Sequence, residues 1–365
     1  MKIAVDARML NASGIGTYLK NLLPYLGKSL RLQLLGEPAA IQALGLGNMA
    51  ETFACSAPVY HPREQWELVS ILRKLQPHLF WSPHFNVPWT GISPARQVTT
   101  IHDVFFLANP RLVSIPKFLY SRFLISKAIK RSRQVITVSE FSKSEILKYT
   151  GAAPEKIQVV HNGVNRQSFK ATAEWPHNKW KKPENGYILY VGNVKPHKNL
   201  ATLVKAHEQL ATRGQSLPLW IVGKKDGFIT GDSALLQQLG ERARHSSGQV
   251  FFTGLVTDQE LQTLYACARV FAFPSLYEGF GLPPLEAMAA GCPVVASDIP
   301  VLREVCQSAA CYAAPANPHD WASKLEEVLA SPRKQADLVQ KGKAQVTGFN
   351  WQKAAEKHLE IFLNT

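Results

Sequence analysis

The stretch YEGFGLPPLEAMAAGCPVVAS, from Tyr277 to Ser297, places two carboxylates around a glycine–proline turn. Its glycines permit backbone angles closed to other residues and let a ligand approach the main chain closely. Its adjacent prolines suit the first turn of a helix, where free amides and the helix dipole bind anions. We expect Glu278 in the loop and Glu286 in the first helical turn. The two would hold different parts of one anionic ligand that carries hydroxyl groups, such as a sugar phosphate or a sugar nucleotide.

Short apolar runs on both sides of this stretch, and throughout the chain, form the elements that must position these residues. They alternate with helix-length segments, which predicts a doubly wound α/β fold. The expected strands are residues 2–6, 31–35, 78–81, 97–101, 134–138 and 157–160 in a first series, and 187–191, 217–222, 250–253, 270–273 and 293–296 in a second. The polar residues 171–183 read as a linker. Two similar domains with a cleft between them follow, with ligands at the carboxyl ends of the strands.

The net charge of +14 is concentrated in the first half of the chain. Residues 1–170 carry 21 Lys and Arg against 9 Asp and Glu, while the remaining residues carry 20 against 18. An acidic partner is therefore expected at the first domain. Residues 116–133 contain six basic and no acidic side chains, with apolar residues at helical spacing. Both a membrane-surface helix and a core-packed helix with a solvated basic face fit this segment.

Composition also bears on cofactors and location. The 365 residues, 46% hydrophobic and 19% charged, suit a soluble two-domain protein. No apolar run approaches the roughly 18 residues of a membrane span. The five cysteines lack metal-ligand spacing, which favours buried free thiols in a reducing cytoplasm. No Asp-x-Asp occurs, so the simplest carboxylate pair for a divalent ion on a diphosphate is missing. We expect a cytoplasmic protein that uses no metal and no bound cofactor.

Polar residues follow several strands of the first series. Gly14 and Gly16 come after the first strand, but Leu stands where a dinucleotide-binding fingerprint needs its third glycine, so only a glycine turn into a helix remains. His102 and Asp103 end a strand and could form a hydrogen-bonding or acid–base pair. His84 holds the same position after the preceding strand. Tight turns and a capping aspartate explain these features equally well.

The second series has comparable strand ends. Residues 192–199, GNVKPHKN, combine a glycine turn with basic residues and suggest phosphate capture by Lys198, although a solvated basic turn is the other reading. Residues 221–225 and 252–256 are further strand–glycine endings. Tight turns account for each of them alone, while together they would surround one pocket with open backbone.

Taken together, these motifs resemble the retaining glycosyltransferases of family four, which have the GT-B fold. The Glu278-x7-Glu286 pattern is a specific match, and residues 138–142, 160–164 and 190–199 are similar to other stretches of that family in the right order. The resemblance implies two Rossmann-like domains that face each other across a cleft. An acceptor-side domain would span residues 1–172, with 350–365 crossing back onto it, and a nucleotide-sugar domain would span 184–346.

The resemblance also implies roles for residues of the second domain. Glu286 would bind the ribose, and Glu278 would hold the donor sugar near its reacting carbon. Lys198 matches the basic diphosphate ligand, but Asn193 stands where the family usually has an arginine. The remaining implied donor contacts are main-chain groups of Phe280, Gly281 and Leu282 at the sugar and diphosphate, main-chain groups of Leu255 and Val256 at the base, and Tyr265.

In the first domain, the resemblance places Gly14 and Gly16 beside the diphosphate. His102 would lie near the reacting end of the donor sugar and would be catalytic together with Lys198 and Glu278. His84 and Asp103 would lie on the acceptor side.

The expected reaction is transfer of a sugar from a nucleotide sugar with retention of configuration and without a metal. The resemblance is greatest to bacterial mannosyltransferases of surface polysaccharide assembly, which implies GDP-mannose as donor, with a UDP-sugar as the alternative. It implies a lipid-linked oligosaccharide as acceptor and a peripheral place at the inner face of the cytoplasmic membrane. A nucleophilic and an orienting role both remain open for Glu278, and we favour orientation. Rival classes are a GT-B epimerase or phosphorylase and a basic nucleic-acid-binding module. We expect no nucleic-acid partner, because the strand-end motifs have no role in such a module.

Overall fold

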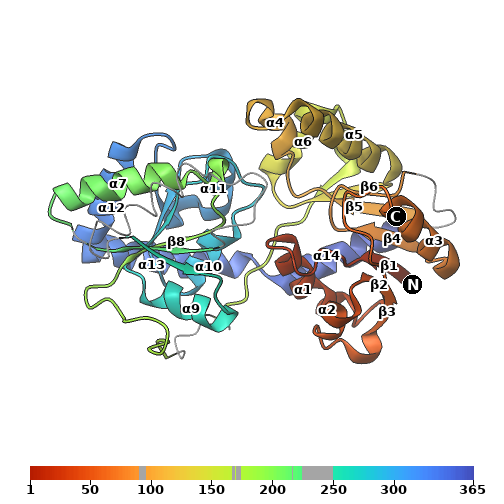
Figure 1. Cartoon of the computed structure of the whole chain (residues 1–365), viewed down its shortest axis with the longest axis horizontal. Helices are drawn as coiled ribbons and strands as arrows, with labels where there is room; N and C mark the ends of the chain where they lie inside the picture. The colour runs from red at the N-terminus through yellow and green to blue at the C-terminus, as the bar shows by residue number, and fades with distance from the viewer. Residues whose placement is uncertain (90–95, 167–168, 170–173, 216, 224–249) are drawn as a thin grey trace. The chain divides into compact units, whose positions relative to one another are not determined.

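Two α/β units make up the chain in the computed structural model, which describes residues 1–89, 96–166, 169, 174–215, 217–223 and 250–365 (Figure 1). The first unit is Met1–Gly163 together with Asn350–Thr365, and the second is Val164–Phe349. Each is a parallel sheet flanked by helices, which confirms the predicted fold class of two doubly wound domains.

The first unit contains, within the described residues, a seven-stranded parallel sheet of order β3-β2-β1-β4-β5-β6-β7. Its strands are β1 (Lys2–Asp6), β2 (Arg31–Gly36), β3 (Ala50–Ala54), β4 (Leu79–Ser82), β5 (Arg96–Thr100), β6 (Gln134–Thr137) and β7 (Ile157–Val159). Its α-helices are α1 (Ile15–Leu26), α2 (Pro38–Gln42), α3 (Glu64–Leu75), α4 (Phe105–Ala108), α5 (Ile115–Arg131), α6 (Glu140–Thr150) and α14 (Trp351–Asn364).

The second unit repeats this plan with six parallel strands in the described residues, in the order β10-β9-β8-β11-β12-β13. They are β8 (Ile188–Val191), β9 (Leu219–Val222), β10 (Val250–Gly254), β11 (Val270–Phe273), β12 (Val294–Ser297) and β13 (Ala310–Ala313). The α-helices are α7 (Leu200–Thr212), α9 (Asp258–Cys267), α10 (Leu282–Ala289), α11 (Pro300–Cys306), α12 (Pro318–Ala330) and α13 (Pro332–Gln345). Helices α7 and α12 pack against each other (Figure 1), and α12 buries Trp321 completely.

Strand order reverses at one place in each sheet. In the first sheet β1 lies between β2 and β4, and in the second β8 lies between β9 and β11. Loops that leave two such neighbouring strands turn to opposite sides, so an open space forms at their carboxyl ends. The residues that follow β1, β4, β8 and β11 are therefore the ones that this topology offers for binding.

All eleven predicted strands are present with small shifts at their ends, because buried parallel strands read as continuous apolar runs. The edge strands β3 and β13 were not predicted. The segment interpreted as a linker is partly packed: Trp175 is buried, and its ring contacts those of Tyr187 and Trp220. That interpretation is wrong for Trp175, whose large apolar ring is stabilised by burial. Residues 171–173 of the segment lie outside the described residues.

The C-terminal helix α14 belongs to the first unit and packs against α1. The hydroxyl of Tyr18 in α1 lies 2.5 Å from Nε2 of His358 in α14, and both side chains are buried. Gly163 lies against the start of this helix. A Cβ atom at Gly163 would overlap the backbone nitrogen of Trp351 and approach its ring at 2.6 Å. The glycine in the sequence VHNGV is therefore needed for the entry of α14 into the first unit.

We expect Gly163→Ala to lower the free energy of unfolding by about 1–3 kcal/mol, because the methyl group forces the start of α14 away from its packed position. Gly348→Ala is the matched control, since a Cβ atom there meets nothing within 4 Å. Denaturant unfolding of both variants measures the effect. Equal stability of the two variants would contradict this explanation of Gly163.

Candidate functional site

Two loops of the second unit meet at the carboxyl ends of β8 and β11. Asn199 lies between the 3-10 turn Pro196–Lys198 and α7, and its side-chain amide donates to the carbonyl oxygens of Pro274 (3.1 Å) and Pro315 (2.7 Å). The amide of Leu276 donates to the carbonyl oxygen of His197 at 2.8 Å. These bonds fix the loop after β8 against the loop after β11.

This arrangement brings together two of the residues predicted from the sequence. Nζ of Lys198 lies 2.5 Å from Oε1 of Glu278, with 21% and 12% of the side chains exposed. The ammonium also lies 5.8 Å from the ring centre of Phe273. Burial, followed by the charge of Lys198, lowers the pKa of His197 to about 3, so His197 is neutral at pH 7. The pair is mostly shielded from water, and its cation remains within reach of an anion.

The glycine loop between Glu278 and α10 has a left-handed backbone that only glycine adopts readily, as its sequence predicts. Gly281 has a φ of 94°, and a Cβ atom there would lie 2.8 Å from Cδ2 of Leu302. The helix begins at Leu282, directly after this residue. The prediction that Glu286 lies in the first turn is therefore wrong: the left-handed glycine starts the helix early, and Glu286 is its fifth residue.

Glu286 is held by a buried tyrosine. The hydroxyl of Tyr265 in α9 donates to Oε2 of Glu286 at 3.0 Å. Burial raises the pKa of Glu286 to about 7, while the hydrogen bond from Tyr265 opposes that rise and the charge of Asp258 adds to it. The carboxyl group therefore exchanges its proton near neutral pH. Groups with such perturbed pKa values gather at functional sites.

The other donor-side predictions lie in the same unit. Phe280 is buried against Phe349, with ring centres 5.7 Å apart. Leu255 is 73% exposed and lies with Val256 between β10 and α9. Asn193 accepts, through its carbonyl oxygen, the hydroxyl of Tyr190 at 3.2 Å. Lys224 and Lys225 lie outside the described residues.

In the first unit, Gly14 caps α1 and Gly16 lies in the first turn of that helix. His102 follows β5, and its Nε2 lies 2.9 Å from the carbonyl oxygen of Pro83. A carbonyl only accepts, so Nε2 carries the ring proton. Burial lowers the pKa of His102 to about 4, with a further lowering by His84. His102 is therefore a neutral imidazole at pH 7 whose Nδ1 is the acceptor.

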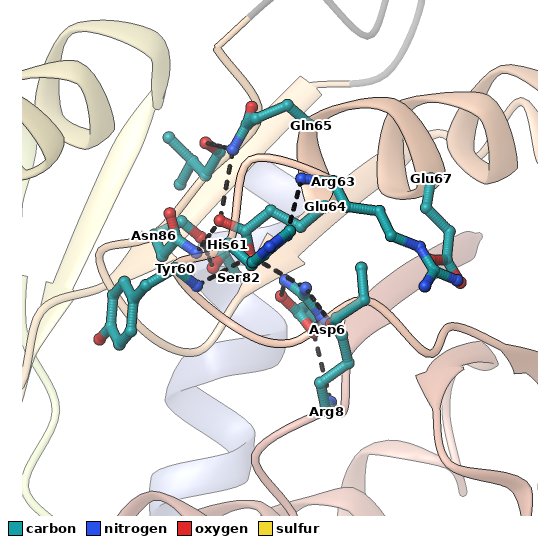
Figure 2. Close-up of polar contacts among 12 residues, drawn as sticks. Asp6, Arg8, Tyr60, His61, Arg63, Glu64, Gln65, Glu67, Ser82 and Asn86 are labelled. Atoms are coloured by element: carbon teal, nitrogen blue, oxygen red, sulfur yellow. Dashed lines mark hydrogen bonds and ion pairs between the residues drawn. The ribbon is translucent and has the colours of Figure 1, made fainter.

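A buried network of charged residues joins the ends of β1 and β4 in the first unit (Figure 2). Arg8 makes a bidentate ion pair with Asp6, at 2.6 and 2.8 Å, and binds Glu64 at 2.9 Å. Asn86 donates to Oε1 of Glu64 at 2.6 Å. Burial opposes ionisation of Asp6, yet the charge and the hydrogen bonds of Arg8, with a smaller contribution from His84, together outweigh it and hold the pKa of that carboxyl well below its usual range.

Of the two predicted acceptor-side residues, His84 lies beside this network. His84 is buried, and its Nε2 lies 3.3 Å from Oδ2 of Asp6 with a geometry too poor for a hydrogen bond. Asp103 accepts the amide of Phe105 at 2.9 Å and so begins α4. The sequence motifs pointed to His84 and Asp103 but missed Arg8 and Glu64. The sequence Asp6-Ala7-Arg8 at the end of a strand was the signal that could have identified Arg8.

Each unit thus gathers its own predicted residues. The second unit combines the cation of Lys198, the carboxylate of Glu278, the start of helix α10 and a carboxyl group that titrates near pH 7. This set can bind an anion with flanking hydroxyl groups and can stabilise negative charge that develops on it. The first unit offers a neutral histidine and a buried ionic network.

Comparison with known proteins matches nearly the whole chain to two family models. A model described as glycosyltransferase family 4 covers residues 12–168, and one described as glycosyl transferases group 1 covers residues 172–345. The chain is 31% identical to the O-antigen chain mannosyltransferase RfbU of Salmonella typhimurium, over 79% of its own length and 75% of that relative. It is 29% identical to the O-antigen chain mannosyltransferase B of Escherichia coli, over 83% and 77%.

Solved structures show the same architecture. Anabaena HepE in complex with UDP and glucose superposes with a TM-score of 0.79 at 19% identity, over 100% of both chains. WaaG, a glycosyltransferase involved in lipopolysaccharide biosynthesis, superposes with a TM-score of 0.74 at 14% identity, over 99% of both chains. At these identities the likeness concerns the fold, and it confirms the predicted GT-B architecture.

We expect Glu286→Gln to make the protein more stable than the wild type at pH 8 but not at pH 5. The pKa of Glu286 is about 7 in the folded protein and about 4.5 in the unfolded chain. As the pH rises through this range the unfolded chain loses the proton before the folded protein does, so the stability of the wild type falls. The free energy of unfolding of the variant should gain about 2 kcal/mol on the wild type over this range. Urea unfolding at both pH values measures it, and a constant difference would refute the raised pKa.

Proposed function

Because the chain belongs to the group 1, family 4 glycosyltransferases, we propose that it is a retaining mannosyltransferase that uses GDP-mannose. The acceptor is a lipid-linked oligosaccharide of a cell-surface polysaccharide. The relatives named above, both called O-antigen chain mannosyltransferases, support the sugar and the acceptor class.

The observation that carries this proposal is the Lys198–Glu278 pair at the carboxyl ends of β8 and β11. A departing nucleoside diphosphate needs positive charge and hydrogen-bond donors, which Lys198 and the amides of Phe280, Gly281 and Leu282 supply. Glu278, released from the ammonium, accepts the hydroxyls of the donor sugar and orients it. The diphosphate accepts the proton of the attacking hydroxyl, which gives transfer on the same face.

We propose the remaining donor contacts on residues of the second unit. Glu286 in its ionised form accepts the ribose hydroxyls, and Tyr265 orients it. Main-chain groups of Leu255 and Val256 contact the base. We further propose that no metal takes part, because Lys198 and the amides supply the charge stabilisation themselves. The roles predicted for Gly14, Gly16 and His102 beside the donor, and for Asn193 at the diphosphate, stay predictions.

Incubation with GDP-mannose, EDTA and a synthetic polyprenyl-diphosphate-linked oligosaccharide should yield an α-mannoside, identified by mass spectrometry and NMR. Lys198→Ala should lower kcat/KM by about 100-fold or more, because it removes the cation that meets the leaving diphosphate. Lys341→Ala, which removes an exposed lysine of α13, is the matched control and should leave the rate unchanged.

Other products would decide against the proposal. If the protein transferred sugar only from a UDP-sugar, the proposed donor GDP-mannose would be wrong. An isomerised free sugar nucleotide as product would indicate an epimerase. Loss of all activity in EDTA would contradict the metal-free mechanism. If neither GDP nor UDP raised the melting temperature of the protein, donor binding itself would be refuted.

Helix α5 supports a peripheral place at the cytoplasmic face of the membrane. Its buried residues, such as Leu124 and Ile125, pack into the first unit, so the predicted core-packed face is present. A second apolar row is exposed at four-residue spacing: Ile115 (75%), Leu119 (56%) and Phe123 (44%). Arg111, Arg122 and Lys130 flank it and are exposed. We propose that this row enters the interface of an anionic bilayer while the basic residues bind its phosphates.

No helix in the described part of the chain is both long and apolar enough to cross a bilayer. Through α5 the protein would attach to the surface of the membrane.

We expect the triple variant Ile115→Ser, Leu119→Ser, Phe123→Ser to lose co-sedimentation with phosphatidylglycerol vesicles at low salt, because it removes the apolar row and keeps every charge. Leu363→Ser is the matched control, since Leu363 is 57% exposed on α14 of the same unit. Wild-type protein that stays in the supernatant, or a triple variant that still sediments, would contradict membrane binding through α5.

A further inference from the structure

Tyr60 lies at the surface of the first unit in a conformation that tyrosine rarely adopts. Its φ is 70°, in the left-handed region, and 41% of the residue is exposed. A bulky side chain in this region is strained, and such strain persists only where the surroundings fix it. Residues held in this way cluster at binding sites. The position therefore calls for an account of what fixes it and what the ring contacts.

The backbone of Tyr60 is held from both sides. Its amide donates to Oε2 of Glu64 at 3.2 Å, and its carbonyl oxygen accepts the hydroxyl of Tyr120 at 3.3 Å. Glu64 is itself buried and fixed by Arg8 and Asn86 (Figure 2). The ionic network lies where the strand order of the first sheet reverses. It holds the backbone of Tyr60 and thereby sets the direction of the Tyr60 ring.

The ring lies beside His84, one of the residues predicted for the acceptor side. Its centre is 6.2 Å from that of His84 and 5.9 Å from that of Phe85. His84 is buried, so Tyr60 rather than His84 presents the accessible surface. Burial and then the charge of Asp103 raise the pKa of the Tyr60 hydroxyl, so this hydroxyl keeps its proton and can donate a hydrogen bond at neutral pH.

We propose that Tyr60 binds the acceptor saccharide, with its ring against the apolar face of a pyranose and its hydroxyl among the sugar hydroxyls. This inference rests on the proposed function and extends it to a residue of the acceptor site. An exposed aromatic ring with one polar tip suits a sugar, whose faces are apolar and whose rim is polar. Glu64 and Arg8 act as positioning residues, since they reach the ligand only through the Tyr60 loop.

The direct test measures binding of an α-linked mannobiose to the full chain by calorimetry, without donor. Tyr60→Ala should weaken binding about tenfold, because the stacking surface is lost, whereas Tyr60→Phe should change it less than about twofold. Tyr25→Ala, which removes another partly exposed tyrosine of the same unit, should bind as the wild type does. Wild-type affinity in Tyr60→Ala, or no mannobiose binding by the wild type, would overturn the proposal.

A double-mutant cycle tests the positioning role of Glu64. When Tyr60 is present, Glu64→Gln should weaken mannobiose binding. In a protein that already carries Tyr60→Ala, Glu64→Gln should weaken binding by less than a further factor of about two, because Glu64 acts through Tyr60. Full additivity would show that Glu64 acts on its own or only through stability. In steady-state kinetics, Tyr60→Ala should raise the KM for the acceptor and leave the KM for GDP-mannose unchanged; equal rises of both would overturn the assignment.

The outcomes separate this inference from the function on which it rests. If mannobiose binding depends on Tyr60 but GDP-mannose is not consumed, the saccharide site stands and the proposed donor fails. If GDP-mannose is consumed and mannobiose binding ignores Tyr60, the function stands and the assignment of Tyr60 fails.

Discussion

The reversal of strand order beside the first strand of each sheet is the constraint on which both candidate sites depend. Loops diverge there, so the sheet leaves a polar space that the chain must fill. Each unit fills it with paired charges, Arg8 with Asp6 and Glu64 in the first unit and Lys198 with Glu278 in the second. Charges so far from water require partners, because an unpaired buried ion costs several kcal/mol. The ionic partners are thus imposed by the topology before any ligand is considered.

The two ionic groups differ in how easily a ligand can replace one of the paired charges. Arg8 binds one carboxylate bidentately and a second through another nitrogen, and 4% of its side chain is exposed. Removing any partner leaves a buried charge, so this group suits a scaffold. Lys198 is a point charge that meets one oxygen of Glu278, and 21% of its side chain is exposed. An anion can replace that oxygen at little cost, so this group suits a binding site.

Sequence reasoning found the strands and the motif-bearing loops, because buried parallel strands and glycine turns leave local signals. It missed β3 (Ala50–Ala54) and β13 (Ala310–Ala313), edge strands whose alanine-rich sequences resemble helix. It placed Glu286 one residue too early in α10, since the helix start depends on the backbone of Gly281. Tyr60 gives no local signal at all, because its conformation is set by Glu64 and by Tyr120, which is 60 residues away.

On the proposed function, the Lys198–Glu278 pair couples recognition of the two halves of the donor. A diphosphate that attracts Lys198 deprives Glu278 of its cation, and the carboxylate then needs other hydrogen-bond donors. The hydroxyls of the donor sugar supply them, whereas a nucleoside diphosphate alone leaves Glu278 near a second negative charge. The same pair would therefore favour the intact donor over the spent one: once the sugar has left, repulsion between Glu278 and the diphosphate returns, and Lys198 is drawn back to the carboxylate as the product departs.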